Sequence, residues 1–352
     1  MKVRSKKSQS CQKDNEHFSP LLYGVFVLVT LAVFLLSVGA GSVSVPLDET
    51  VSVLASAIRR EAIDSPSATI LLTVRLPRVI CVALVGAALS VSGAAMQGLL
   101  KNPLADGSTL GVSSGASLGA VIAIAFGVSV PGVPYLGTMG MAMLFAFLSL
   151  LLILGLAYRL DSSLSTNTII LIGVIFSMFV SSILNLIVTL ASDKVKQITF
   201  WTMGSLQGST YTDAAVLFAA LVLCGGVLLA NATELNAFSL GEDNARSIGV
   251  SVRRVKLTVL IAVSALIGVC VSVSGTIGFV GLVTPHMTRM LVGPNHKRLL
   301  PASVFAGACF LMLSDLAARV ILRPLELPIG VVTSFVGAIA FILIFYRSRG
   351  GR

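Results

Sequence analysis

The sequence predicts an all-α polytopic membrane protein with about ten transmembrane helices, in which spans 2–5 and 7–10 form an inverted internal repeat. Hydrophobic residues make up 55% of the 352-residue chain and charged residues only 11%, whereas soluble domains carry about 25% charged residues. Several apolar runs reach the ~20 residues that cross a bilayer. A segment interrupted by Gly and Pro also returns in the second half, which is typical of membrane proteins built from internal repeats.

The repeated pattern is an SVSG tetrapeptide with a Pro ten residues beyond it and a Gly eight residues further on. It occurs at 90–93 with Pro103 and Gly111, and again at 272–275 with Pro285 and Gly293. The copies are 182 residues apart. Because five predicted crossings separate them, they should run in opposite directions. A chance recurrence of SVSG in a chain rich in Ser, Val and Gly is the alternative. At Asn102-Pro103 and Thr284-Pro285 we expect a helix start, with Asn or Thr as N-cap.

The ten predicted spans follow one another with short connections. They are 22–40, 69–100, 111–128, 134–156, 168–190, 213–231, 255–274, 276–292, 301–321 and 329–346. The second span is long enough to cross obliquely, and the eighth is short, with Pro285 near its start. The chain thus divides into a basic tail (1–20) and a single transmembrane domain (21–352).

The distribution of Lys and Arg sets the orientation. Most of them fall in the tail, in alternate short loops and at the C-terminus, which predicts that both termini are cytoplasmic. The first apolar run is long and has no clear small-residue cleavage site, so an uncleaved first span is favoured over a signal peptide. The positive residues form no stripe of the kind that binds nucleic acid.

Three polar segments interrupt the spans. Residues 41–68 form a predicted outer loop. Residues 191–212, which contain Trp201, form a predicted short interfacial helix. Residues 232–254 form the longest predicted inner loop.

The residue types of catalysis and metal binding are not grouped in this sequence. The five cysteines have no CxxC spacing. His286 and His296 have no Cys, Glu or His at the spacing of metal ligands, so we expect no metal site. No catalytic constellation and no GxxxxGK[ST] phosphate loop is present, so ATP is not expected to bind this chain. Asp315 lies one helical turn before Arg319, which favours structural pairing. A transporter coupled to an ion gradient and an intramembrane enzyme are the alternatives from other classes.

Several segments occur in the order of a known family. They are 75–78 (RLPR), 86–106 (GAALSVSGAAMQGLLKNPLAD), 164–166 (LST), 201–204 (WTMG), 239–250 (SLGEDNARSIGV), 275–289 (GTIGFVGLVTPHMTR), Asp315 with Arg319, and 326–334 (ELPIGVVTS). From residue 68 onward the sequence therefore resembles the FecCD-type permeases, the membrane subunits of ABC importers for iron–siderophore complexes, haem and cobalamin. Gly107 and Ile339 depart from the pattern, since the family often has Pro near these positions.

The resemblance implies three functional elements. An ATPase-coupling helix would be formed by Leu240, Gly241, Glu242, Ala245, Ile248 and Gly249, and its apolar face (Leu240, Ala245, Ile248) would dock on the partner. Arg75, Arg78, Arg319 and Arg323 would receive acidic residues of a binding protein, because guanidinium binds carboxylate bidentately. Ser165 and Thr166 would form a cytoplasmic gate. The alternatives are a helix at 240–249 that rests on the membrane surface or packs on its own spans, internal pairing or snorkelling of the arginines, and simple helix capping by the Ser/Thr turn.

The resemblance also implies partners and cargo. We expect a homodimer in the bacterial plasma (inner) membrane with two copies of an ABC ATPase subunit, which would bind ATP and Mg²⁺, and an extracytoplasmic substrate-binding protein. Ferric siderophores are the expected cargo, with haem or cobalamin as the alternative within the family.

Overall fold

The computed structural model describes residues 20–41, 45–59, 65–130, 135–161 and 164–349. The predicted basic tail lies outside these residues except for Pro20, which begins the first described helix. The C-terminal Arg352 also lies outside them.

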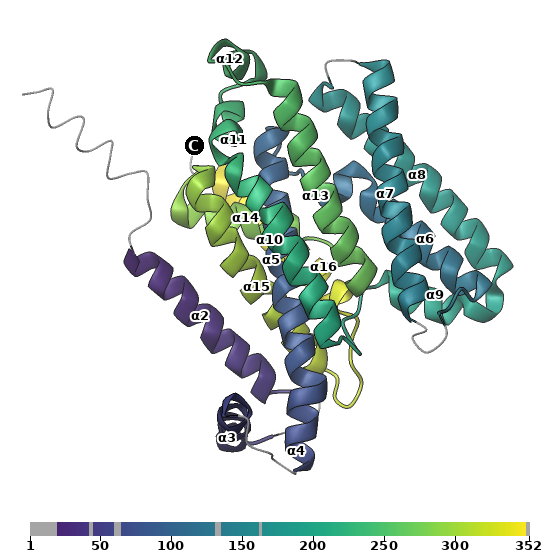
Figure 1. Cartoon of the computed structure of the whole chain (residues 1–352), viewed down its shortest axis with the longest axis vertical. Helices are drawn as coiled ribbons and strands as arrows, with labels where there is room; N and C mark the ends of the chain where they lie inside the picture. Colours follow the sequence, from purple (N-terminus) through teal and green to yellow (C-terminus); the bar gives the residue numbers. More distant parts are fainter. Residues whose placement is uncertain (1–19, 42–44, 60–64, 131–134, 162–163, 350–352) are drawn as a thin grey trace, which may run out of the picture.

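A helix occupies each of the ten predicted spans (Figure 1). These helices are α2 (Pro20–Gly39), α5 (Leu76–Leu99), α6 (Val112–Phe126), α7 (Tyr135–Leu160), α8 (Thr166–Leu190), α10 (Tyr211–Ala230), α13 (Val252–Ser274), α14 (Val280–Val292), α15 (His296–Val320) and α16 (Ile329–Arg349). Among the described residues, seven helical stretches are long and apolar enough to cross a membrane. The helices α6 and α14 are shorter, at 15 and 13 residues. The all-helical membrane fold is confirmed.

The second span is a continuous helical rod. It begins at α4 (Pro66–Thr69), passes through the π-helical stretch η1 (Ile70–Arg75) and continues as α5, so that Ser67–Leu99 forms one 33-residue apolar stretch. This confirms the long second span.

Smaller helices connect these spans. They are α3 (Leu47–Ile58), η2 (Gly107–Leu110), η3 (Ser192–Lys194), α9 (Val195–Thr202), α11 (Ala232–Ser239) and α12 (Glu242–Ser247). Of these, α9 is the short helix predicted around Trp201.

The two halves of the predicted repeat run in opposite directions. Figure 1 shows α5 rising from α4 toward the end of the molecule that carries α12, and α13 running back from α12. We name these ends the α12 end and the α3 end.

The constant offset of 182 residues, however, does not join equivalent positions. Gly111 precedes α6 with a φ of 76°, whereas Gly293 follows α14 with a φ of 84°. The opposite directions of α5 and α13 agree with an inverted repeat (Figure 1), while the matching Pro and Gly spacings do not mark equivalent places in the two halves.

Both predicted helix starts at proline are wrong. Asn102 Oδ1 accepts a hydrogen bond from the Leu104 amide at 2.9 Å, which makes a turn before η2 rather than a cap. Pro285 lies inside α14, which begins at Val280. Because Pro285 has no N–H, the carbonyl of Gly281 loses its helical donor.

The side chain of Gln97 on α5 replaces that donor. Its Nε2 donates to the carbonyls of Gly281 and Leu282 at 3.4 and 3.1 Å, and its Oε1 accepts from Arg289 Nη2 at 3.1 Å. The internal proline of α14 is thus tolerated because a neighbouring helix satisfies the freed backbone group.

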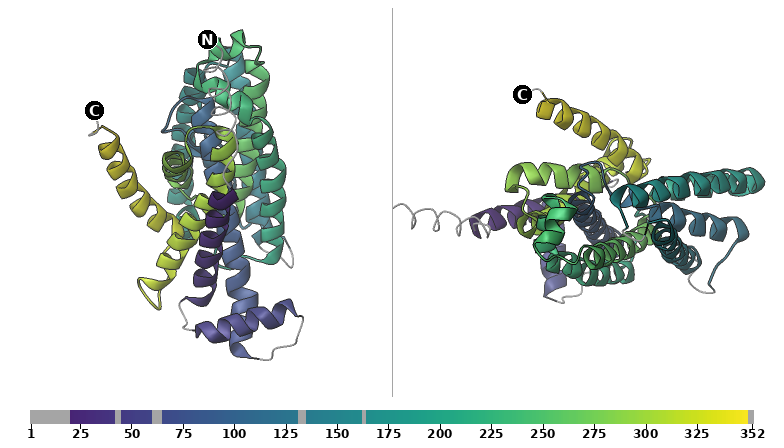
Figure 2. Two further views of the ribbon diagram at one scale, coloured as in Figure 1. Left: turned by 90° about the vertical axis from the view of Figure 1, so that its left-hand side faces the viewer. Right: turned by 90° about the horizontal axis from the view of Figure 1, so that it is seen from above.

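The core is arranged around α5, which packs closely against α14 and α15. A Cβ added at Gly93 would lie 1.8 Å from the Gly281 carbonyl oxygen, and one added at Gly86 would lie 2.3 Å from that of Gly307. Small residues allow backbones to approach in lipid, where hydrophobicity does not drive helix association. By contrast, α16 diverges from the bundle (Figure 2).

Candidate functional site

The predicted ATPase-coupling segment lies at the α12 end and surrounds a six-residue helix, α12. Leu240 and Ile248, immediately outside the helix, are 65% and 66% exposed, whereas Ala245 is fully buried. The expectation that these three residues share one apolar face is therefore wrong, because α12 turns Ala245 toward the body of the protein. Two apolar side chains remain on the surface at this end.

Glycines set the shape of this segment. Gly241 precedes α12 with a φ of 115°, and Gly249 follows it with a φ of 91°. L-residues rarely adopt such values, so glycine is required for the sharp turns that make α12 project. The acidic pair Glu242 and Asp243 occupies the first turn of the helix, where negative charge is favourable.

The predicted gate residues lie directly beside this segment. Ser165 is the N-cap of α8 and accepts from the Thr168 amide at 3.4 Å, as the capping alternative predicts. Thr166 Oγ1 donates to Glu242 Oε1 at 3.1 Å. The structure thus brings the α7–α8 loop and α12 into contact, although they are 76 residues apart in the sequence.

A buried lysine joins the same two segments. Lys256 Nζ on α13 pairs with Glu242 Oε1 at 2.7 Å and donates to the Leu164 carbonyl at 2.7 Å. Its side chain is fully buried, while that of Glu242 is 30% exposed. Leu164 itself has a φ of 53°, which is uncommon for a residue other than glycine.

The predicted docking arginines gather near the α3 end, and three of the four are buried. Arg78 donates to Asp315 Oδ1 through Nε and Nη2, at 3.1 and 2.9 Å, and to Glu326 Oε2 through Nη1 at 2.7 Å. Arg319 Nε donates to Asp315 Oδ2 at 2.8 Å, so the predicted pairing of Asp315 with Arg319 is confirmed.

The remaining donors of the buried arginines hold the end of α2. Arg75 donates to the carbonyls of Val38 and Gly39, and Arg319 to those of Ser37 and Ala40. The last carbonyls of a helix have no partner within it, and basic side chains can satisfy them.

Only Arg323 among the four predicted docking residues is exposed. The contacts of the other three favour the internal-pairing alternative for them. We call Arg75, Arg78, Asp315, Arg319 and Glu326 the arginine cluster.

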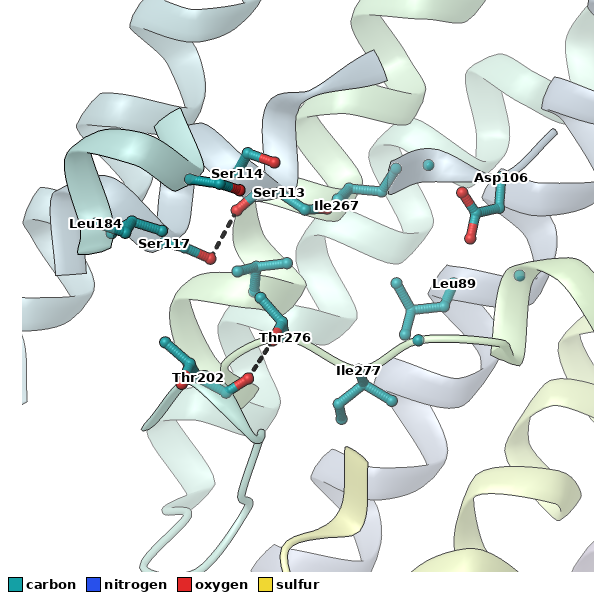
Figure 3. Close-up of a pocket in the computed structure, with 15 residues that line it drawn as sticks. Leu89, Asp106, Ser113, Ser114, Ser117, Leu184, Thr202, Ile267, Thr276 and Ile277 are labelled. Atoms are coloured by element: carbon teal, nitrogen blue, oxygen red, sulfur yellow. Dashed lines mark hydrogen bonds between the residues drawn. The ribbon is translucent and has the colours of Figure 1, made fainter. Parts of the chain in front are cut away.

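A cavity of about 350 Å³ lies among α5, α6, α8, α9 and the segment that precedes α14 (Figure 3). Hydroxyl side chains line much of it, namely Ser113, Ser114, Ser117, Ser181, Thr202 and Thr276. Of the described residues in its lining, Asp106 alone is charged, and it lies on the wall opposite the α6 serines (Figure 3). Among the described residues, no group of three or more His, Cys, Asp or Glu could hold a metal ion.

Comparison with known proteins decides the family. A family model described as the FecCD transport family matches residues 29–347. The chain belongs to the FecCD transport family.

Relatives of this FecCD-family chain differ in their named cargo. The uncharacterized ABC transporter permease protein YvrB of Bacillus subtilis is 48% identical over 82% of each chain. The molybdate import system permease protein MolB of Haemophilus influenzae is 35% identical over 96% of this chain and 98% of its own. The hemin transport system permease protein HmuU of Yersinia pestis is 38% identical over 80% and 84%.

A solved structure shares the fold of this FecCD-family chain. It is an inward-facing ABC transporter described as of the metal-chelate type, with a TM-score of 0.82 and 32% sequence identity, and the match covers 94% of this chain and all of that one. The predicted fold class and family are thereby confirmed.

Two charged residues of this FecCD-family chain were missed by the sequence reasoning. Lys256 lies within the predicted seventh span, and an ionisable residue inside a span is a functional candidate by default. Glu326 begins the family segment 326–334, but nothing in the sequence indicated that it pairs with Arg78 across the fold.

Proposed function

We propose that this FecCD-family permease carries a metal chelate inward by alternating access, driven by an ABC ATPase subunit that docks at the α12 end. The observation that carries the proposal is the segment around α12: Leu240 and Ile248, which flank the helix, are exposed, and Glu242 in its first turn contacts the α7–α8 loop. Exposed apolar side chains on a projecting turn suit docking into a groove of a partner. ATP and Mg²⁺ would then bind in the partner subunit.

The α7–α8 loop would act as the cytoplasmic gate. Ser165 fixes the start of α8, and Thr166 contacts α12, so the loop would follow a displacement of the coupling segment. In this arrangement the α12 end faces the cytoplasm, which agrees with the distribution of Lys and Arg in the sequence.

The α3 end would receive the substrate-binding protein. Arg323 is the exposed member of the four predicted docking residues and would accept a carboxylate of that protein. Arg75, Arg78 and Arg319 would support this surface from within, since their donors are committed to the arginine cluster and to the end of α2.

The functional unit would be a homodimer with two ATPase subunits, in the bacterial plasma membrane. Ferric siderophores are the proposed cargo, with haem or cobalamin as the alternative. The cavity supports weak selectivity for large cargo over tight binding of a small anion, because the described residues that line it include hydroxyl groups and Asp106 but no Lys or Arg. An isolated oxyanion would find no opposite charge there.

Ion coupling is the second candidate function, because Asp106 lines the cavity and a carboxylate there could accompany a cation. The buried Asp315, by comparison, is paired with two arginines and is a poor proton relay.

The two candidates are separated by uptake in a strain that lacks this chain. Cells carrying the chain together with the ATPase subunit should accumulate labelled ferric siderophore, and cells with an ATPase subunit unable to hydrolyse ATP should not. Haem, cobalamin and molybdate are measured in parallel and decide the cargo. Uptake that persists without ATP hydrolysis but collapses with the ion gradient would contradict the proposal.

A further inference from the structure

One buried lysine contacts both α12 and the α7–α8 loop. Lys256 lies in the second turn of α13 with no exposed surface, and its ammonium group has acceptors on both segments, Glu242 Oε1 and the Leu164 carbonyl, each at 2.7 Å. Burying an ammonium group is costly unless such acceptors surround it. Lys256 therefore holds both segments to one point of α13.

A second contact closes the arrangement. Thr166 Oγ1 donates to the same carboxylate oxygen of Glu242 that Lys256 contacts. Hydrogen bonds to charged groups are stronger than those between neutral groups. A shift of α12 that carries Glu242 with it therefore acts on the loop twice, through Thr166 directly and through Lys256.

The loop conformation itself depends on the lysine. Leu164 is almost fully buried and left-handed, and such a residue persists only when its surroundings hold it. Its amide donates to the Asp161 carbonyl at 2.9 Å, while its own carbonyl accepts from Lys256. Without the ammonium group, the Leu164 carbonyl would be buried without this donor.

We propose that Lys256 is a positioning residue that makes α12 and the α7–α8 loop move as one unit, so that a force applied to α12 reaches the gate. This inference rests on the proposed function, because it takes α12 as the docking site of the ATPase. Coupling between separated sites requires a connected element that both sites bias. The connection formed by Thr166, Glu242 and Lys256 supplies that element within one subunit.

The test is hydrogen–deuterium exchange on the full chain in complex with its co-expressed ABC ATPase subunit, with and without ATP plus orthovanadate. Peptides over 241–250 report α12, and peptides over 161–168 report the loop. In the wild type, ATP plus orthovanadate should change the rate of amide exchange in the peptides of α12 and in those of the loop. In Lys256→Met, α12 should keep its response while the loop loses most of its response, because the connection to the Leu164 carbonyl is lost and only the Thr166–Glu242 contact remains.

Two further variants make the result decisive. Thr166→Val removes one contact and leaves the lysine paired, so it should reduce the loop response even if Lys256→Met fails to fold. Arg254→Met removes an exposed cation from the same region of α13 and should leave both responses intact. A purely structural lysine would change exchange equally with and without nucleotide.

The outcomes separate the two claims. If α12 responds to nucleotide but the loop does not in the wild type, or if the loop responds as strongly in Lys256→Met and Thr166→Val as in the wild type, Lys256 does not transmit the motion. If the wild-type chain binds no ATPase subunit, or α12 shows no nucleotide response, the proposed function fails instead.

Discussion

Replacing Asp315 with Asn should destabilise the fold by about 3 kcal/mol, at the lower end of the cost of breaking a buried ion pair. Asp315 is 1% exposed, and its two oxygens accept three hydrogen bonds, two from Arg78 and one from Arg319. Asn retains one acceptor, so one arginine keeps its partner. The other arginine faces the side-chain NH2 group of Asn, which also donates. Its buried positive charge then lies next to the positive end of the amide dipole.

The assay is reversible unfolding by SDS in mixed micelles, followed through the fluorescence of Trp201, the only Trp in the sequence. Glu326→Gln is the matched control. Its side chain is 22% exposed and pairs with Arg78, and Arg78 would keep its second partner, Asp315, so a loss of about 1 kcal/mol or less is expected. If Asp315→Asn unfolds within 1 kcal/mol of the wild type, the arginine cluster does not hold the α3 end together. The buried arginines would then be open to the docking role.

Three other substitutions test separate features. Gly93→Val should prevent α5 from packing on α14, because its Cβ would meet the Gly281 carbonyl oxygen at 1.8 Å. The expected cost is about 3 kcal/mol, the upper end of the usual range for overpacking, and near-wild-type unfolding would refute this close approach. Gln97→Leu should cost about 1–3 kcal/mol in the same assay, because the carbonyl freed by Pro285 loses its donor, and an unchanged midpoint would show that this contact is dispensable. Arg323→Glu should leave the unfolding free energy within about 0.5 kcal/mol but weaken binding of the substrate-binding protein, most strongly at low salt; unaltered affinity at low salt would remove Arg323 from the docking surface.

The sequence predicted the helices well because their signal is local. Apolar runs of bilayer length placed all ten spans, and the spacing of Asp315 and Arg319 predicted their pairing. Predictions that required knowledge of the backbone between helices were less successful. The sequence predicts a helix start at Pro285, since proline is common at the first position of a helix, but Gln97 on another helix allows it to lie inside α14.

The site shows the same limit. The motif predicts a coupling segment, yet which of its apolar residues face outward depends on the packing of a six-residue helix against the bundle. That packing buries Ala245 and exposes Ile248, and no short periodic pattern could reveal it. The partners of Arg78 lie 237 and 248 residues away in the sequence, so its burial followed only from the fold.

The most direct test of the central claim is whether an ABC ATPase subunit binds this chain at the α12 end. The co-expressed subunits are purified together and their mass is measured by light scattering, for the wild type and for Ile248→Arg. Ile248 suits this test because it is 66% exposed, whereas a side chain at Gly241 would strain its φ of 115° and confuse folding with docking. We expect a stable complex of two chains with two ATPase subunits for the wild type, and dissociated subunits around a folded permease for Ile248→Arg. A wild-type chain that purifies without an ATPase subunit, or an Ile248→Arg complex as stable as that of the wild type, would contradict the claim that an ATPase subunit docks at the α12 end.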